Sequence, residues 1–472
     1  MVKRILRDFS IYGLMPYIPK LSYFFVLPFI TPFLTKFDYG VYGLVFSYFS
    51  FLGILQTLGL EVNLHNSFYK SREQYKWFWR QIYGFILTWS IPFAAIVTFV
   101  LSFAITEVPL HNKITIIILM VIPGLTVSAG KDIGICYCTL KRMPMPIMAR
   151  SAIFGILNLG ILYYLVKYQR MGYMGWFWGF AICACLENIS WFLFVRKQKE
   201  FAPIFNFKRK TIIRSLKVSV PILPHVNALF ILNQSDRIVM DWLKVSTAQI
   251  GLYSAGYSLS SAMATMTNAY ITAVTPYFLQ LLSEKKEKLI RIIVFASQAA
   301  FLLIAILFSL VCKEITEFLF RNKEFDDMTG IVVLLSLCSI FKPMYMMSTT
   351  PYSFYEKTKF FSVQSFIAAF VNLALNFILV PYGGIYAAAV STIIGFMYLS
   401  FSRFYSKTFK QLVSLEYYPT FWILLGTGVC VFCYYVALQG LMLRMTILGL
   451  LLVAIILGTL FFKDKVIKMV KQ

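Results

Sequence analysis

The sequence predicts an all-α integral membrane protein with about 14 transmembrane helices, arranged as two six-helix lobes followed by two further helices at the C-terminus. Three observations predict this class. The 472 residues are 59% hydrophobic with a mean hydropathy of +0.73, whereas soluble globular chains are about 45–50% apolar. The apolar residues gather into segments of membrane-spanning length. Two motifs recur in the second half of the chain.

Fourteen segments are long enough to cross a bilayer, because a span needs roughly 17–25 mostly apolar residues. Stretches that contain charged residues, Gly or Pro separate most of them and mark where the spans end. In order, the expected spans are 12–34, 40–60, 81–104, 114–138, 146–166, 173–195, 218–240, 248–279, 290–312, 329–352, 361–380, 384–402, 418–438 and 444–462.

The distribution of Lys and Arg predicts that both termini are cytoplasmic. With the N-terminus inside, the bases of the inner segments outnumber those of the outer loops by roughly three to one, while Asp and Glu divide almost evenly. The net charge of +24 is therefore interpreted as membrane orientation and not as a sign of nucleic-acid binding. We expect a multi-pass membrane protein, and the resemblance given below implies the bacterial inner (plasma) membrane.

An internal repeat predicts that the two lobes are related to each other. The tetrapeptide "YGVY" at 39–42 is similar to "IGLY" at 250–253, and "ILNLGILYYLV" at 156–166 is similar to "FVNLALNFILV" at 370–380. Each second copy lies six spans after the first, so both copies enter the membrane in the same direction. Such parallel repeats are related by an axis along the membrane normal. We expect a cavity between the two lobes.

The repeat divides the chain into four parts. These are an N-lobe at 1–195, a basic cytoplasmic linker at 196–217, a C-lobe at 218–405, and a region at 406–472 that holds the last two spans and a basic tail. The linker, "RKQKEFAPIFNFKRKTIIRSLK", contains eight Lys or Arg residues. It fits a partly amphipathic segment that lies on anionic headgroups, and it fits equally well the positive charge of an ordinary cytoplasmic loop.

The sequence indicates neither an enzyme nor a metal protein. The stretch "GLTVSAGKD" at 124–132 differs from a phosphate-binding loop in its glycine spacing, and Asp132 stands where Ser or Thr is required. Cys430 and Cys433 form a CxxC motif inside a span, without the further ligands that zinc needs. No nucleophile–base pair stands out in the sequence. We therefore expect no catalytic residues and no metal site.

Charged residues inside the spans are the candidates for function, since each costs roughly 2.5–3.5 kcal/mol at mid-span unless it faces water or a partner. We expect a mildly cationic set, drawn from both lobes, to line the cavity and to suit phosphate oxygens. Its members are Lys20, Lys131, Asp132, Asp236, Arg237 and Lys342. The alternative is that these residues form salt bridges between helices, such as Lys131 with Glu187.

Asp236 and Arg237 stand side by side near the end of span seven. We expect Arg237 to contact the substrate or a gate near the outer end of the cavity. The adjacent Asp236 would hold the guanidinium there and lower the cost of placing it in the membrane. A snorkelling pair that fixes the end of the span is an equally simple interpretation.

Several motifs, in the same order along the chain, resemble those of a known family. "SVPILPH" (219–225), "NQSDRIV" (233–239) and "IGLYSAGYSL" (250–259) are similar to the start of the second lobe in polysaccharide flippases. These are the O-antigen and capsule repeat-unit exporters of the multidrug/oligosaccharidyl-lipid/polysaccharide superfamily. "KFDYGVYGLVFSY" (36–48) resembles their first-loop signature, and "YEKT" (355–358) followed by "VNLALNFILVPYGGIYAAAVST" (371–392) resembles their eleventh and twelfth spans. The resemblance covers about residues 12–400 and implies a MATE-like fold.

The resemblance implies a substrate and a mechanism. The substrate would be an oligosaccharide on an undecaprenyl pyrophosphate carrier, moved from the cytoplasmic to the outer leaflet for the synthesis of O-antigen, lipopolysaccharide, capsule or another surface polysaccharide. Access would alternate through rocking of the two lobes, without ATP and without a cofactor. Membrane lipids, a polysaccharide polymerase and glycosyltransferases would be the partners.

The resemblance also implies a candidate cation site. Related lipid-linked peptidoglycan precursor flippases have a sodium site between spans seven, eleven and twelve, and Asn372, Asn376 and Thr392 match its positions. Asn376 stands where a carboxylate is expected, which weakens the case for sodium or proton coupling. The alternative is that the amides pack helices together, at about 0.6 kcal/mol each.

Two other functions remain open at this point. A multidrug or cation antiporter of the same superfamily would have a buried acidic residue and, usually, twelve spans. A scaffold that recruits glycosyltransferases through the basic linker would not transport at all. In that case, removal of charge at Lys20, Arg237 and Lys342 would leave polymer production intact.

Overall fold

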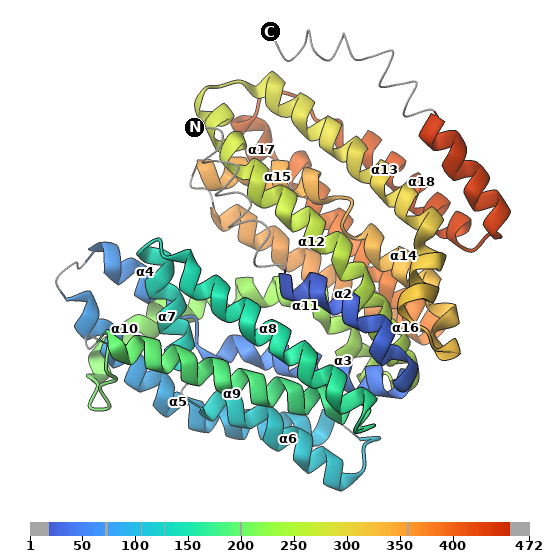
Figure 1. Ribbon diagram of the computed structural model, residues 1–472. Helices are drawn as coiled ribbons and strands as arrows, with labels where there is room; N and C mark the ends of the chain where they lie inside the picture. The colour runs from blue at the N-terminus through green and yellow to red at the C-terminus, as the bar shows by residue number, and fades with distance from the viewer. Residues whose placement is uncertain are drawn as a thin grey trace.

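The computed structural model describes residues 18–70, 74–104, 106–126, 128–198, 201–355 and 358–453. These residues form helices and the turns that connect them, and no strand occurs among them. In Figure 1, α5 to α9 lie in one bundle and α12 to α18 in another, while α2, α3 and α11 lie between them.

The first bundle and the helices beside it come from the predicted N-lobe. They are α2 (Ile18–Ile30), η3 (Thr31–Phe33), α3 (Lys36–Gln56), α4 (Glu61–Lys70), α5 (Tyr75–Ala104), α6 (Leu110–Leu125), α7 (Ala129–Leu140), α8 (Pro144–Lys167) and α9 (Met174–Lys197).

The second bundle comes from the predicted C-lobe and the C-terminal region. Its elements are η4 (Val220–Ile222), α11 (Leu223–Trp242), α12 (Thr247–Ser283), α13 (Glu287–Leu319), η5 (Lys323–Met328), α14 (Thr329–Leu337), α15 (Lys342–Phe354), α16 (Thr358–Phe401), η6 (Ser402–Tyr405), α17 (Lys407–Leu412) and α18 (Pro419–Ala437). A last helix covers Leu441–Val453.

The predicted fold class is confirmed, because the helices follow the expected spans in order. Seven of the described helical stretches are long and apolar enough to cross a membrane alone, and α6 with α7, bent by 47°, make an eighth. The remaining spans coincide with helices that are shorter, broken or more polar, and the expected span at 444–462 extends beyond the described residues. Large apolar side chains such as Phe99, Ile153 and Leu424 are exposed on the outside, as expected for contact with lipid.

The α16 helix contains two of the expected spans. Its backbone leaves helical geometry at Gly384, where φ is 54° and ψ is −135°, a conformation that glycine tolerates and other residues avoid. On either side of this break, Asn372 and Thr392 are within hydrogen-bonding distance at 3.4 Å. Because 20 residues of straight helix would extend about 30 Å, the chain must reverse direction at Gly384. The sequence predicted this reversal at the boundary between spans eleven and twelve.

The basic linker contains an amphipathic helix, α10 (Arg209–Ser219), that lies against the first bundle. Asn63 of α4 donates through Nδ2 to the carbonyl of Ser215 at 3.0 Å. The Nε atom of Arg80 donates to the carbonyl of Ala202 at 2.8 Å. The linker is therefore attached to the N-lobe by specific bonds, and its contact with anionic headgroups stays a prediction.

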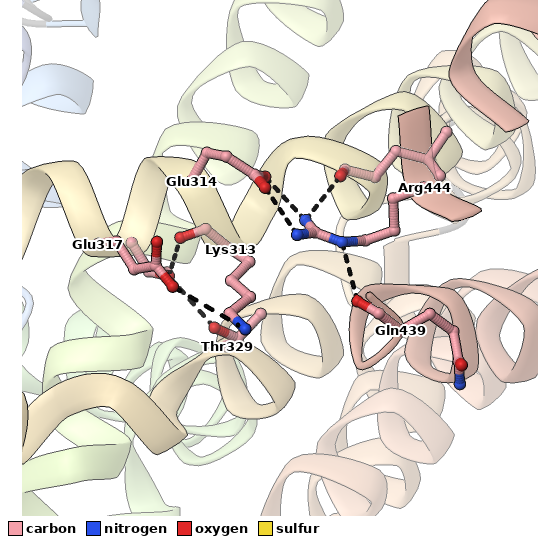
Figure 2. Close-up of polar contacts among 8 residues, drawn as sticks. Lys313, Glu314, Glu317, Thr329, Gln439 and Arg444 are labelled. Atoms are coloured by element: carbon pink, nitrogen blue, oxygen red, sulfur yellow. Dashed lines mark hydrogen bonds and ion pairs between the residues drawn. The ribbon is translucent and has the colours of Figure 1, made fainter. Parts of the chain in front are cut away.

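Arg444 anchors the last described helix to α13, as Figure 2 shows. Its Nη1 and Nη2 atoms donate to the two carboxylate oxygens of Glu314 at 2.7 and 2.6 Å. It also donates to the carbonyls of Leu310 and Gln439, and only 2% of it is exposed. A buried guanidinium is costly unless its donors are satisfied, and the bidentate pair satisfies them. The ion pair therefore holds the C-terminal addition against the C-lobe.

Candidate functional site at the contact between the lobes

The two copies of the repeated tetrapeptide pack against each other. A Cβ atom on Gly40 of α3 would overlap the carbonyl oxygen of Thr247, and a Cβ atom on Gly251 of α12 would overlap the carbonyl oxygen of Lys36. Two helices come this close only where small residues face each other. Glycine is thus required at both positions by the backbone of the opposite helix.

The contact is reciprocal. Lys36 and Gly40 lie 211 positions before Thr247 and Gly251, so Lys36 corresponds to Thr247 and Gly40 to Gly251 in the repeat. Gly40 meets Thr247, and in the same way Gly251 meets Lys36. A two-fold axis between α3 and α12 produces this arrangement, as it does in symmetric dimers. The repeat therefore predicted two related helices, and the structure shows that they meet at their most similar segment.

Further bonds join the lobes at the same end of the molecule, which we name the far end and define by the connections at 31–35, 168–173, 243–246 and 320–328. Thr31 donates through Oγ1 to the carbonyl of Leu319 at 3.0 Å and accepts from the amide of Arg321 at 3.2 Å. Asn322 donates to the carbonyl of Leu34 at 2.9 Å. The amide of Lys36 donates to the Glu324 carboxylate, also at 2.9 Å.

The start of α3 is fixed by its own residues before it meets the C-lobe. Thr35 and Asp38 form a capping box, in which each side chain accepts from the other residue's amide. The second carboxylate oxygen of Asp38 accepts from the amide of Tyr173, in the turn between α8 and α9, at 2.7 Å. The far end of α3 is thus held to the N-lobe on one side and to α12 on the other.

The opposite end, which we name the linker end, is defined by the connections at 201–208 and 284–286. The two bundles of Figure 1 diverge toward this end, where α4, α10 and α17 lie. The bonds described above, which join the two lobes, lie at the far end.

Arg237 lies directly beneath the far-end contact. Its Nε atom donates to Oγ of Ser254 on α12 at 2.9 Å, and its Nη1 atom donates to Gln234 at 2.7 Å. The guanidinium also stacks over the ring of Tyr257, 4.4 Å from its centre. Gly43 of α3 faces both Ser254 and the Arg237 side chain, with 3.5 Å from its ideal Cβ position to Arg237 Cδ. A Cβ atom at this position would overlap the Ser254 hydroxyl, to which Arg237 donates.

Asp236 has partners different from those of Arg237, because consecutive helical residues point about 100° apart. Its carboxylate accepts from Tyr253 Oη at 2.5 Å, from Asn376 Nδ2 at 2.7 Å and from Thr392 Oγ1 at 2.8 Å. It is 1% exposed. The expectation that Asp236 holds Arg237 is therefore replaced by a network that joins α11, α12 and both halves of α16.

This network contains the three residues of the candidate cation site. The side-chain oxygens of Asn372 and Asn376 are buried and have no hydrogen-bond partner among the described residues. The amide nitrogens of these two residues, and not their oxygens, face Thr392 and Asp236. A carboxylate, a hydroxyl and amide oxygens are nevertheless the ligand types that small hard cations prefer. Asp236 supplies the carboxylate that position 376 lacks.

Lys342, at the start of α15, belongs to the same region of the C-lobe. It lies half-buried, with its Nζ atom 5.7 Å from the centre of the Phe396 ring. It lines a small cavity of about 50 Å³ together with Tyr257 and Thr392. Tyr257 also stacks on Arg237 and Thr392 also donates to Asp236, so this cavity borders both networks.

The N-lobe candidates are placed elsewhere. Lys131 of α7 forms a salt bridge with Glu187 of α9 at 2.8 Å, with 37% of the lysine side chain exposed. This is the interhelical pair that the sequence offered as the alternative to a cavity role. Asp132 is the next residue of α7 and is half-buried. Lys20 falls within α2, but its side chain lies outside the described residues. The structure therefore brings the C-lobe candidates together around Tyr257 and Thr392, whereas Lys131 is paired within the N-lobe.

Two buried arginines were missed by the sequence analysis, which placed them at the ends of spans. Arg403 is fully buried and donates to the carbonyl of Leu399 at 2.6 Å and to Ser365 at 3.2 Å. Arg444 pairs with Glu314 as described above. In the sequence, each of these arginines is only a base within one turn of an apolar run. That pattern does not indicate burial, because it is also common where a side chain snorkels to the interface.

Among the described residues, no three His, Cys, Asp or Glu side chains gather as metal ligands.

A family model described as polysaccharide biosynthesis protein matches residues 5–282, which is more than half of the chain. The chain belongs to this family. The resemblance of its motifs to polysaccharide flippases is thereby confirmed. No curated protein matches the sequence of this family member.

Solved structures agree with this assignment at the level of the fold. The chain is similar to the lipid II flippase MurJ in an inward closed conformation, with 14% identity and a TM-score of 0.66 over 96% of this chain and 99% of that one. It is also similar to the inward-facing conformation of a multidrug resistance MATE family transporter of the MOP superfamily. That match has 11% identity and a TM-score of 0.58, over 88% of this chain and 95% of the transporter. This polysaccharide biosynthesis protein thus has the fold of that superfamily.

Replacing Gly251 with Leu should part α3 and α12 at the far end, because the new side chain would overlap the Lys36 carbonyl. We expect a loss of stability of about 1–3 kcal/mol and faster hydrogen–deuterium exchange at residues 36–43 and 247–254. Gly160→Leu on α8 is the matched control, since nothing lies within 4 Å of its Cβ position. Equal stability and exchange in the two variants would contradict the proposed packing.

Proposed function

We propose that the protein is a flippase that moves undecaprenyl-pyrophosphate-linked oligosaccharides between the two leaflets of the membrane for polysaccharide biosynthesis. The observation that carries the proposal is the reciprocal α3–α12 contact, which closes one end of a two-lobed bundle. A diphosphate with several sugars cannot cross hydrocarbon unaided. Polar groups along a path between two lobes, which close alternately at each end, would replace the water around the diphosphate and the sugars. The prenyl tail of the same molecule would stay in lipid.

The distribution of Lys and Arg gives the orientation of the protein in the membrane, and with it the proposed direction of transport. Many of the Lys and Arg residues in the connections lie at the linker end, with α10 and its flanking residues. By the positive-inside rule this end is cytoplasmic. We place both termini there and place the protein in the bacterial inner membrane. The far end, where α3 and α12 meet, then faces the side on which the lipid-linked sugar would be delivered.

Arg237 and Lys342 have distinct roles in this proposal. Arg237 lies beneath the closed far end, and parting of α3 from α12 would remove its bond to Ser254. Its guanidinium would then be free to pair with a diphosphate, a bond that is stronger than those between neutral groups. Lys342 lies deeper in the C-lobe and would add a second positive charge to the same path. The diphosphate would thus stabilise the state in which the far end is open.

Cation binding at Asp236 would couple to the same change. Asp236 accepts from Tyr253 on α12, and α12 carries the glycine that closes the far end. A sodium ion held by Asp236, Asn372, Asn376 and Thr392 would compete with Tyr253 for the carboxylate. We propose that sodium binding therefore weakens one of the attachments that keep α11 and α12 in the closed arrangement.

Two other functions make different predictions for the same protein. A multidrug antiporter would expel cationic dyes from vesicles, and Asp236 is a buried acid of the kind it would need. A scaffold for polymerase or glycosyltransferases would support polymer production without flipping. The cationic pair Arg237 and Lys342 favours an anionic substrate over a cationic one.

Flipping should depend on those two bases. In vesicles that contain the purified protein and a fluorescent undecaprenyl-pyrophosphate oligosaccharide, Arg237→Gln and Lys342→Gln should each slow translocation by about tenfold or more, because a charge-assisted hydrogen bond contributes roughly 1.5–3 kcal/mol. Arg237→Lys should retain part of the rate. Lys288→Gln, which removes an exposed lysine of α13, should have no effect. Translocation at the rate of the Lys288→Gln variant in both cases would exclude the proposed role of the bases.

Sodium should stabilise the protein through Asp236. In detergent, the melting temperature of the unaltered chain should rise with NaCl but not with the same concentration of KCl. At a sodium concentration one hundred times Kd, the free energy of unfolding should increase by about 2.7 kcal/mol. Asp236→Asn and Thr392→Val should each remove the difference between the salts. Asp326→Asn, an exposed carboxylate in η5, should keep it. Identical melting in the two salts for the unaltered chain would rule out this cation site.

A further inference from the structure

The outer surface of the N-lobe has a groove between α8 and α9, which run side by side in Figure 1. We name it the α8–α9 groove, and its volume is about 360 Å³. At the linker end its walls are polar, with Arg150, Ser190 and Lys197. Deeper in the membrane the walls are apolar, with Phe154, Leu186, Ile189 and Leu193. The groove thus changes from cationic to apolar along its length.

Arg150 is held in a fixed position within the groove. Its Nε atom donates to Oγ of Ser190 at 3.0 Å, and its Nη1 atom donates to the carbonyl of Pro146 at 3.0 Å. The guanidinium stacks on Trp191 and Phe194, with 4.5 and 4.8 Å to the ring centres. Its Nη2 atom has no hydrogen-bond partner among the described residues. An arginine fixed by stacking and by two bonds loses little freedom when it binds an anion with its remaining donor.

Lys197 gives the groove a second positive charge. It is exposed at the C-terminal end of α9, on the same wall as Ser190. The nearest acidic residue along α9 is Glu187, and its carboxylate is already bound by Lys131 at 2.8 Å. The linker end of the groove is therefore suited to an anion.

The apolar part of the groove is suited to a hydrocarbon chain. Ile189 and Leu193 are 42% and 51% exposed, and they face outward from the bundle beside other exposed apolar residues such as Ile153. From Lys197 to Leu186 the helix descends about 16 Å. An anion at the top and an acyl chain along this descent match the shape of one phospholipid.

We propose that the α8–α9 groove binds an anionic phospholipid from the surrounding leaflet, with its phosphate between Arg150 and Lys197 and one acyl chain along Phe154, Ile189 and Leu193. The groove opens sideways to the bilayer, where phospholipids are the abundant source of phosphate. Basic positions at the cytoplasmic ends of transmembrane helices bind anionic headgroups in this way. The inference does not depend on the proposed flippase function.

Native mass spectrometry of the full chain can test this site. After purification from vesicles of phosphatidylglycerol and phosphatidylethanolamine, the protein should retain one phosphatidylglycerol, and the double variant Arg150→Gln/Lys197→Gln should retain it about tenfold less. Arg196→Gln/Lys210→Gln removes the same charge at the same end but outside the groove, and it should retain the lipid. Equal loss in both double variants would overturn the proposal, because it would show attraction to net charge alone.

Two further measurements separate a lipid site from a structural role of Arg150. Ile189→Trp should fill the apolar part of the groove and displace phosphatidylglycerol, although every charge remains. Lys197→Gln alone should weaken retention without altering the melting temperature. Full retention by Ile189→Trp would contradict the proposal. Preferential retention of undecaprenyl phosphate over an equal concentration of phosphatidylglycerol would also contradict it, since the carrier lipid would then be the ligand.

Discussion

The arrangement of this protein depends on one contact, the close approach of α3 and α12 at Gly40 and Gly251. Because neither glycine has a side chain, the backbone of each helix reaches the carbonyl oxygen of the other. The hydrogen bonds at Thr31 and Lys36 lie at the same end and hold the connections of the two lobes together. In a membrane, helices gain little from the hydrophobic effect, so association depends on close packing and on such bonds.

The contact also decides where the charged residues lie. It brings Ser254 to the Nε atom of Arg237, and Tyr253 of the same helix donates to Asp236. Both charges are then satisfied by partners on a helix that must move if the far end opens. This polysaccharide biosynthesis protein thus holds its buried cation and its buried carboxylate where a movement of α12 would release them. Lys342 extends the positive charge deeper into the same lobe.

The sequence predicted the spans and the reversal at Gly384 because hydropathy and glycine act locally. It also found the repeated tetrapeptides, but the contact between them depends on how two distant segments pack. For the same reason it assigned Asp236 to Arg237, its neighbour in sequence, whereas the partners of Asp236 are 17 to 156 positions away. Arg403 and Arg444 were missed because burial of a base at a span end depends on partners such as Glu314. The cavity role of Lys131 and Asp132 stays a prediction.

The most direct test is to lock the far end. Lys36→Cys with Glu324→Cys places two thiols where the lobes meet. Glu287→Cys with Ser414→Cys places two at the linker end, between α13 and the start of the C-terminal region. A short, reducible thiol cross-linker should stop the flipping of a lipid-linked oligosaccharide in the first variant, with recovery on reduction, and should leave the second variant and the unaltered chain active. Full activity of the first variant while cross-linked would show that the far end need not open for transport, and the account would be wrong.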